Sequence, residues 1–364
     1  MSAELGPRRP RLALALPAAD LKNSRGRWPL ALRSVVGHPT CEENAESSLP
    51  TEASGGCTAL NRREVLASIT GAVAAAAAPR LALGQKAGAL AATELATGLL
   101  AIAGAGANVV AATGAGGTLL VDGGSPQGSA ALLDLMRERS GARNVDVLFN
   151  TSWRDEHTGS NEALGASGTK IAAHVNTKLW LGGDFDVDWE QRHYAPRPAA
   201  ALPSMTFYTS GTLDFDGRKV EYRYLPRAHT DGDVAVFFPD ANVLAAGALV
   251  AVGAYPVPDY ATGGWIGGLE AATRALLAGT DRATKIVPAL GPVCGRADLE
   301  AQLKLCTAVR ESVADAYRRG LSFNEFVATK PTQEFDAARG DPSLFLKLVH
   351  KGAWAHIREL GGVI

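Results

Sequence analysis

The sequence predicts an α/β fold, with α+β character, in which two mixed β-sheets pack together and helices cover them. Strand-like and helix-like patterns alternate in each half of the chain, and hairpin patterns lie between them. Such elements bury their apolar sides by stacking in layers. Of the 364 residues, about 280 follow an N-terminal segment of different character, a length that suits one such domain.

The first half is expected to begin with two strands joined by a glycine-rich turn, followed by a helix and two more strands. Their expected ranges are, in order, 107–113, 117–122, 126–139, 145–150 and 170–174. The helix places Leu132, Leu133, Leu135 and Met136 on one face. Residues 151–161 are polar and irregular, and we expect a loop there.

The second half is expected to contain two hairpins, two helices and one further strand. The hairpin strands have the expected ranges 211–217 with 220–225, and 234–239 with 242–247. A helix over 267–278, a strand over 285–288 and a helix over 297–319 follow, and the chain ends in a helical tail over about 297–364. No internal repeat of fixed short period is present.

Composition and charge exclude several classes of function. Hydrophobic residues make up 46% of the chain and charged residues 20%, which is typical of a soluble globular protein with a sizeable core. The 36 Lys and Arg residues nearly balance the 37 Asp and Glu residues, giving a net charge of -1. Because there is no basic excess, the sequence gives no sign of a nucleic-acid partner.

The four cysteines form no C-x-x-C pair, so a zinc ribbon or thioredoxin-type site is not indicated. Cys294 and Cys306 would be able to pair in an oxidising compartment, but two separate thiols are at least as good an interpretation.

The N-terminus is expected to be a targeting segment. Residues 1–60 have no clear period and are expected to form a disordered extension. Arg62 and Arg63 precede an Ala-rich apolar run, and small residues follow it up to Gly84, which resembles a twin-arginine export signal over 61–84. The interpretation predicts an exported, periplasmic protein whose folded domain occupies 85–364.

Two other points concern this segment. The apolar run is shorter than the roughly 20 residues a membrane span needs, so the mature chain is expected to have no such span. An Ala-rich helix in a cytoplasmic protein is the alternative. The stretch ahead of the arginine pair is long for a signal, which implies either an extended leader or a true start further along the chain.

Four stretches, in the same order and with compatible spacing, resemble motifs of the metallo-β-lactamase superfamily, and of its periplasmic-type hydrolases in particular. They are residues 119–124 (LLVDGG), 150–161 (NTSWRDEHTGSN), 228–233 (AHTDGD) and 288–293 (PALGPV). The resemblance runs from about Ala107 to about Val293. It implies a four-layer αββα sandwich and a hydrolase-like site.

The superfamily's chemistry uses two zinc ions held by histidines and carboxylates. Carried over position by position, its seven ligand positions hold Ser152, Arg154, Glu156, His157, His229, Ala248 and Leu290. Only Glu156, His157 and His229 are able to bind a metal, and the family divides them between its two ions. We therefore expect no metal cofactor, with a single zinc on these three residues as the alternative.

The replacements suggest how the site is stabilised without metal. Without its ions, Glu156 would be a buried charge lacking a partner, which costs several kcal/mol. Arg154, two residues away, would supply the opposite charge and would repel a zinc ion. We therefore expect an Arg154–Glu156 ion pair where zinc would lie, with Ala248 and Leu290 forming an apolar wall.

The remaining candidates have ordinary as well as functional interpretations. His157 and His229 are residual catalytic candidates together with Glu156, or else inherited histidines satisfied by their neighbours. Asp122 and Asp233 are expected to support the loops, and His174 to be structural. Six aromatic residues would line the rim of the site or the core: Trp153, Trp180, Trp189, Tyr255, Tyr260 and Trp265. Ser167 and Lys170 match S-x-x-K without its companion motifs, so chance explains them.

Three functions compete. The first is a pseudoenzyme, inactive as a zinc hydrolase, whose pocket still binds a small molecule. The second is an atypical mononuclear or metal-free hydrolase of a small ester, lactone or lactam that uses His157, His229 and Glu156. The third is an ordinary two-zinc hydrolase, which the scattered remaining histidines do not favour.

Overall fold

The computed structural model describes residues 89–141 and 144–360. The N-terminal extension and the twin-arginine-like segment, residues 1–84, lie outside the described residues. Within the described ranges, no helix is both long and apolar enough to cross a membrane.

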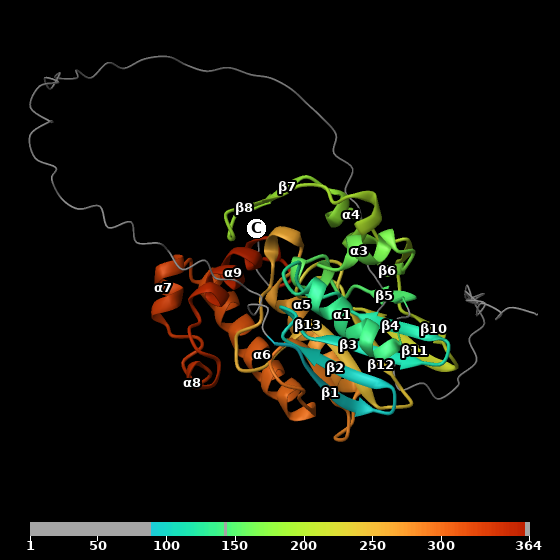
Figure 1. Ribbon diagram of the computed structural model, residues 1–364. Helices are drawn as coiled ribbons and strands as arrows, with labels where there is room; N and C mark the ends of the chain where they lie inside the picture. Colours follow the sequence, from blue (N-terminus) through green and yellow to red (C-terminus); the bar gives the residue numbers. More distant parts are fainter. Residues whose placement is uncertain (1–88, 142–143, 361–364) are drawn as a thin grey trace, which may run out of the picture. The chain divides into compact units, whose positions relative to one another are not determined.

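A seven-stranded sheet forms from the first half of the domain (Figure 1). Its strand order is β1 (Ala91–Ala96), β2 (Leu99–Ala103), β3 (Val109–Gly114), β4 (Gly117–Val121), β5 (Val147–Phe149), β6 (Lys170–His174) and β9 (Met205–Phe207). The strands pair antiparallel from β1 to β4 and parallel from β4 to β9, so the sheet is mixed.

A five-stranded sheet forms from the second half. Its order is β10 (Gly211–Phe215), β11 (Arg218–Tyr224), β12 (Val234–Phe238), β13 (Val243–Ala251) and β14 (Lys285–Leu290). All neighbours are antiparallel except β13 and β14, which are parallel. A separate two-stranded ribbon pairs β7 (Phe185–Val187) with β8 (Arg192–Tyr194).

The helices fall into two groups along the chain (Figure 1). The first group is α1 (Ser129–Ser140), α2 (Asp155–Thr158), α3 (Asn161–Ala166) and α4 (Val175–Gly182). The second group is α5 (Ile266–Gly279), α6 (Arg296–Arg318), α7 (Phe323–Ala328), α8 (Asp336–Arg339) and α9 (Ser343–Trp354). Two short 3-10 turns occur at Ala199–Ala201 and Tyr260–Thr262.

The five-stranded sheet is apolar on both faces, as β12 shows. Val234, Val236 and Phe238 pack between the two sheets, whereas Ala235 and Phe237 pack against the second group of helices. This alternation follows from the two-residue repeat of a strand. One run of apolar residues therefore contributes to two cores.

The seven-stranded sheet is built in the same way. Leu119 and Val121 of β4 face the other sheet, and Leu120 packs with Leu132 and Met136 of α1 on the outer side. Helix, sheet, sheet and helix thus form four layers. The expected αββα sandwich is confirmed.

Asn108 connects the two sheets just before β3. Its backbone N–H donates to the carbonyl of Ala289 at 2.7 Å, and its side-chain amide donates to the carbonyls of Pro288 and Gly291 at 2.9 and 2.8 Å. These three bonds fix the backbone on both sides of Leu290.

The structure differs from the expected elements in several places, and α4 and β9 are among the elements that the sequence did not predict. Strands β1 and β2 precede the first expected strand and are held by Leu95, Leu99 and Ile102, all of which are buried. The expected loop over 151–161 contains α2 and the start of α3. The ribbon of β7 and β8 has strands of three residues each, too short to give a two-residue pattern that the sequence would reveal.

Candidate functional site

The candidate site lies where β4 and β5 end. These strands are parallel, so the residues that follow them, Asp122 and Asn150, come out at the same edge of the sheet. Asp122 adopts a positive φ of 66°, which an aspartate tolerates better than most residues. Asn150 and Asn161 exchange side-chain amide bonds at 3.0 and 2.9 Å, which closes the loop between them.

Asp122 organises the beginning of this loop. Its carboxylate accepts hydrogen bonds from the backbone and the hydroxyl of Thr151, both at 2.8 Å, and lies 2.7 Å from Nδ1 of His157. Burial is the largest single influence and disfavours a charged imidazole, but the charge and hydrogen bond of Asp122, together with the charges of Glu156 and Asp233, raise the pKa of His157. Nδ1 of His157 is therefore occupied by Asp122, and its Nε2 is buried without a hydrogen-bond partner among the described residues.

His229 is oriented from the other side by backbone. Its Nδ1 donates to the carbonyl of Val257 at 2.6 Å, so its Nε2 carries the lone pair in the neutral ring. Burial, followed by the nearby charge of Arg154, lowers the pKa of His229 to about 4. Nε2 of this histidine is also buried, and no residue in the described part of the chain is its hydrogen-bond partner.

Asp233 holds the loop that carries His229. Its carboxylate accepts from the backbone N–H groups of His229 and Thr230 at 2.6 and 2.8 Å, and from the Thr230 hydroxyl at 2.7 Å. Burial raises the pKa of Asp233 to about 7 even though these bonds favour the charged form. Its role in this geometry is to fix the loop.

Arg154 lies at the centre of the site, with its side chain only 2% exposed. Its guanidinium donates to Glu190 and to Asp259, the latter at 3.3 Å, and its Nε lies 3.8 Å from Glu156. We call these four residues the Arg154 cluster. Burial works against the charge, but the three carboxylates raise the pKa of Arg154. It is therefore a permanent cation.

Two indole rings pack against the same guanidinium. The Trp153 and Trp189 centroids lie 4.9 and 5.3 Å from its central carbon, within the range of cation–π contact. Trp189 also donates from Nε1 to Asp259 at 2.8 Å. Arg154 is thus fixed in both position and orientation.

Comparison with known proteins decides the family. The sequence model of the metallo-beta-lactamase superfamily matches residues 103–290, more than half of the chain. This chain belongs to the metallo-beta-lactamase superfamily. The match includes all seven carried-over ligand positions and ends on the last of them, Leu290.

Similar solved structures include three metallo-beta-lactamases. The one from Pontibacter korlensis is 21% identical, with a TM-score of 0.49 over 60% of this chain and 99% of that chain. DIM-1 is 17% identical, with a TM-score of 0.49 over 60% and 98%. TMB-1 is 17% identical, with a TM-score of 0.48 over 60% and 97%. No curated protein gives a significant match.

The superfamily's two-zinc centre does not fit the residues that this member carries. Arg154 occupies a histidine position with a permanent positive charge, and Ser152 beside it is buried against the Arg154 backbone at 3.4 Å. Ala248 and Leu290 offer no ligand atoms. Across the described residues, no three His, Cys, Asp or Glu side chains are grouped so that they would hold a metal ion.

The expected Arg154–Glu156 ion pair is present, with Nε of Arg154 3.8 Å from the Glu156 carboxylate. What the sequence did not predict is that the hydrogen bonds of Arg154 go to two further carboxylates, Glu190 and Asp259. Glu190 and Asp259 were missed because they lie 36 and 105 residues further along the chain, outside every superfamily motif. Glu190 follows Trp189 and Asp259 precedes Tyr260. Their position next to aromatic residues of the expected rim was the only feature of the sequence that indicated a place near the site.

The expected aromatic rim is divided between two places. Trp153, Trp180 and Trp189 gather in a small apolar cluster of their own. Trp265 stacks on His356 at 4.0 Å, and Tyr255 stacks on Phe345 at 5.0 Å. The first group adjoins the Arg154 cluster, and so does Tyr260, which directly follows Asp259 and donates from its hydroxyl to Asp188 at 2.6 Å.

The first apolar group supports the strap, which we define as residues 183–197 and which includes β7 and β8. The strap supplies Glu190 and Trp189 to Arg154, and the Tyr194 hydroxyl donates to Glu190 at 2.7 Å. Arg192 and Arg197 both pair with Asp155 of α2. This superfamily member therefore covers its arginine with a hairpin that is fastened to Arg154 and Asp155 at the start of α2.

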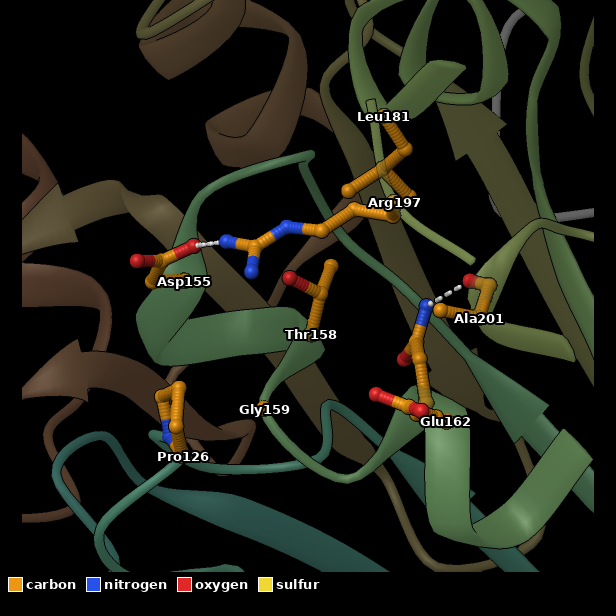
Figure 2. A pocket seen from close by; sticks show the side chains of 9 residues that line it. Pro126, Asp155, Thr158, Gly159, Glu162, Leu181, Arg197 and Ala201 are labelled. Atoms are coloured by element: carbon orange, nitrogen blue, oxygen red, sulfur yellow. Dashed lines mark hydrogen bonds and ion pairs between the residues drawn. The ribbon is translucent and has the colours of Figure 1, made fainter. Parts of the chain in front are cut away.

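A small hollow lies beside α2 on the side of Asp155 and Thr158 (Figure 2). Its volume is about 110 Å³, and Arg197 reaches across it to Asp155. Neither Glu156, His157 nor His229 lines it. The hollow is therefore separate from the residues that superfamily members use as ligands.

His174 ends β6 and caps α4. Its Nδ1 accepts from the backbone N–H of Asn176 at 3.2 Å, and its ring stacks on Tyr224 at 3.8 Å. These contacts give it a structural task away from the Arg154 cluster. Cys294 and Cys306 are separate thiols.

Proposed function

We propose that this superfamily member is not a two-zinc hydrolase and that its former metal site now serves for binding. The observation that carries the proposal is the buried Arg154 guanidinium, held by Glu190 and Asp259 at a ligand position. A metal ion placed there would find a histidine position filled by a guanidinium, which has no lone pair to donate. It would also have to compete with Arg154 for the same carboxylates.

One observation favours a second candidate, a metal-free or mononuclear hydrolase of a small ester, lactone or lactam. The Nε2 atoms of His157 and His229 are buried and have no partner among the described residues. Unpaired buried polar atoms are uncommon unless they have a task. His229 would accept a proton at Nε2, and a charged His157 would donate one, with Glu156 close to both.

Metal content and activity of the purified full chain test both candidates. We expect less than one zinc per two chains and no hydrolysis of a chromogenic cephalosporin or a simple lactone. Chelator-independent hydrolysis that is lost in His229→Ala would support the metal-free hydrolase. Two zinc ions per chain would overturn the main proposal.

Restoring the ligands gives a sharper test. The combined variant Ser152→His, Arg154→His, Ala248→Asp and Leu290→His should bind zinc and gain chelator-sensitive hydrolysis. The same variant with His157→Ala is the matched control and should lose that activity. Equal activity in the wild-type chain would contradict the proposal.

We also propose that residues 61–84 direct export as a twin-arginine signal. The support is the sequence pattern alone: paired arginines ahead of a mild apolar run. In a bacterial host, a chain with Arg62→Lys and Arg63→Lys should remain in the cytoplasm while the unaltered chain reaches the periplasm. Equal distribution of the two chains would contradict export by this route.

A further inference from the structure

The Arg154 cluster contains more negative than positive charge. One guanidinium faces three carboxylates within 4 Å, those of Glu156, Glu190 and Asp259. The nearby His157 is paired with Asp122, so this histidine adds no net positive charge to the cluster. When ionised, the four groups of the cluster carry two surplus negative charges. Such a surplus is costly at a site this well buried unless a cation compensates it.

The three carboxylates are not equally satisfied. Asp259 accepts from Trp189 Nε1 at 2.8 Å and from the Thr262 hydroxyl at 2.7 Å, in addition to Arg154. Glu190 accepts from the Tyr194 hydroxyl and from Arg154. Glu156 accepts no hydrogen bond from another residue within the described ranges. Its side chain is 14% exposed, so solvent reaches it.

A second free acceptor faces the same region. His229 is 3% exposed, and its Nδ1 edge is fixed on the Val257 carbonyl. The opposite edge presents the unpartnered lone pair of Nε2. The backbone carbonyl of His229 accepts from the backbone N–H of Asp259 at 2.8 Å, which places the histidine beside the cluster.

We propose that Glu156 and the Nε2 atom of His229 together bind the primary ammonium group of a small ligand. An ammonium carries the missing positive charge and three N–H donors, and it needs no fixed coordination geometry. A metal ion is less suitable because no three ligand side chains gather here within the described residues. An anion would meet the surplus negative charge. The inference rests on the proposed function, in which no pair of zinc ions fills this site.

The test is titration of the metal-free full-length chain with n-propylammonium chloride by isothermal calorimetry. We expect saturable binding with one site per chain. Propyltrimethylammonium, which has the same charge but no N–H donor, should bind at least about tenfold more weakly because it cannot form the charge-assisted hydrogen bonds. This comparison uses the wild-type protein and does not depend on any variant folding.

Two variants locate the site. Glu156→Gln should weaken propylammonium binding about tenfold, the loss expected when one charged hydrogen bond becomes neutral. Glu162→Gln is the matched control, because Glu162 is an exposed carboxylate on α3 outside the cluster, and its affinity should equal that of the wild type.

Three results would overturn the inference: no saturable binding, equal binding of the quaternary ion, or equal weakening by both variants. Zinc content measured on the same preparation keeps the two proposals apart. Two zinc ions per chain as purified would refute the proposed function. A chain that contains little zinc and does not bind propylammonium would refute the ammonium site alone.

Discussion

Arg154 is enclosed by side chains from three separate parts of the chain: α2, the strap and the turn that contains Asp259. A buried ion pair contributes little net stability when it forms, because both charges lose their water. Removing one member is a different matter, since the partners stay buried and unpaired. The arginine is therefore hard to replace once it is present.

Replacing Arg154 alone should destabilise the fold strongly. Arg154→Met keeps much of the side-chain volume but leaves Glu156, Glu190 and Asp259 without their cation, and we expect a loss of about 3–5 kcal/mol in the free energy of unfolding. Urea denaturation measures it. The control is Arg192→Met, which removes the ion pair between Arg192 and Asp155. Because the Arg192 side chain is 48% exposed, this variant should lose less than about 1 kcal/mol. A similar loss in both variants would contradict the special status of Arg154.

The thiols of Cys294 and Cys306 should react slowly in the native chain. Burial raises the pKa of each to about 12, and for Cys294 the charge of Asp298 adds to the effect. At pH 8 the thiolate fraction should be roughly a thousandfold below that of an exposed cysteine. Alkylation by iodoacetamide followed by peptide mass mapping measures each site.

The same shift has a consequence for stability. Because the folded pKa lies above the unfolded one, these thiols favour folding below about pH 9. That contribution is lost as the pH rises towards 12. Rapid labelling of Cys294 or Cys306 at pH 8 in folded protein would contradict the burial of these groups.

The sequence allows the site to be found only in part, and the reason is visible residue by residue. Ser152, Arg154, Glu156, His157 and His229 are found because they stand in motifs whose neighbours are held by local backbone bonds. Glu190 and Asp259 reach the same guanidinium through tertiary folding, and no local pattern encodes that contact. The sequence therefore located the loop residues of the candidate site more completely than the residues that reach Arg154 from other parts of the chain.

At the scale of elements, the strap is the part that the site depends on most. It contains only two short strands, yet Val187 and Tyr194 are buried with Trp153 in a cluster separate from the main cores. Its fastening points are polar: Glu190 on Arg154, and Arg192 and Arg197 on Asp155. Such an element is held by a few contacts and can be loosened through one of them.

Glu190→Gln should loosen the strap without unfolding the domain. The variant removes the charge that binds Arg154, so backbone amides of residues 185–194 should exchange hydrogen faster, by about tenfold, while those of β12 stay protected. Hydrogen exchange with mass spectrometry measures this. Asp186→Asn changes an exposed carboxylate of the same strap and should leave exchange unaltered. Unchanged exchange in Glu190→Gln would show that the apolar cluster alone holds the strap.

The elements were predictable to different degrees for a physical reason. Strands β12, β13 and β14 are continuous apolar runs, because each is buried on both faces, and the sequence located all three. Strand β1 has four of its six residues Ala or Thr and only one, Leu95, fully buried, so it gives little signal. Its place comes from pairing with β2 rather than from its own composition.

At the scale of the whole molecule, stability depends on the layer between the two sheets. Phe238 is fully buried there, among side chains from both sheets. Phe238→Ala should cost about 3–5 kcal/mol because the cavity would be enclosed on both sides. Urea denaturation measures the loss, and Val327→Ala on α7, which is 38% exposed, should change stability by less than about 1 kcal/mol. A small effect at Phe238 would mean that the sheets can close the gap.

The hydrogen bonds of Asn108 bear on how easily this protein could change its chemistry over evolutionary time. They hold the peptide on either side of Leu290 whatever the side chain at that position. A histidine introduced at position 290 would therefore have its backbone already held in place by these bonds. Under the proposed function, gaining a metal site at this edge of the fold is therefore a matter of side chains, and a mutational library at positions 152, 154, 248 and 290 would explore it.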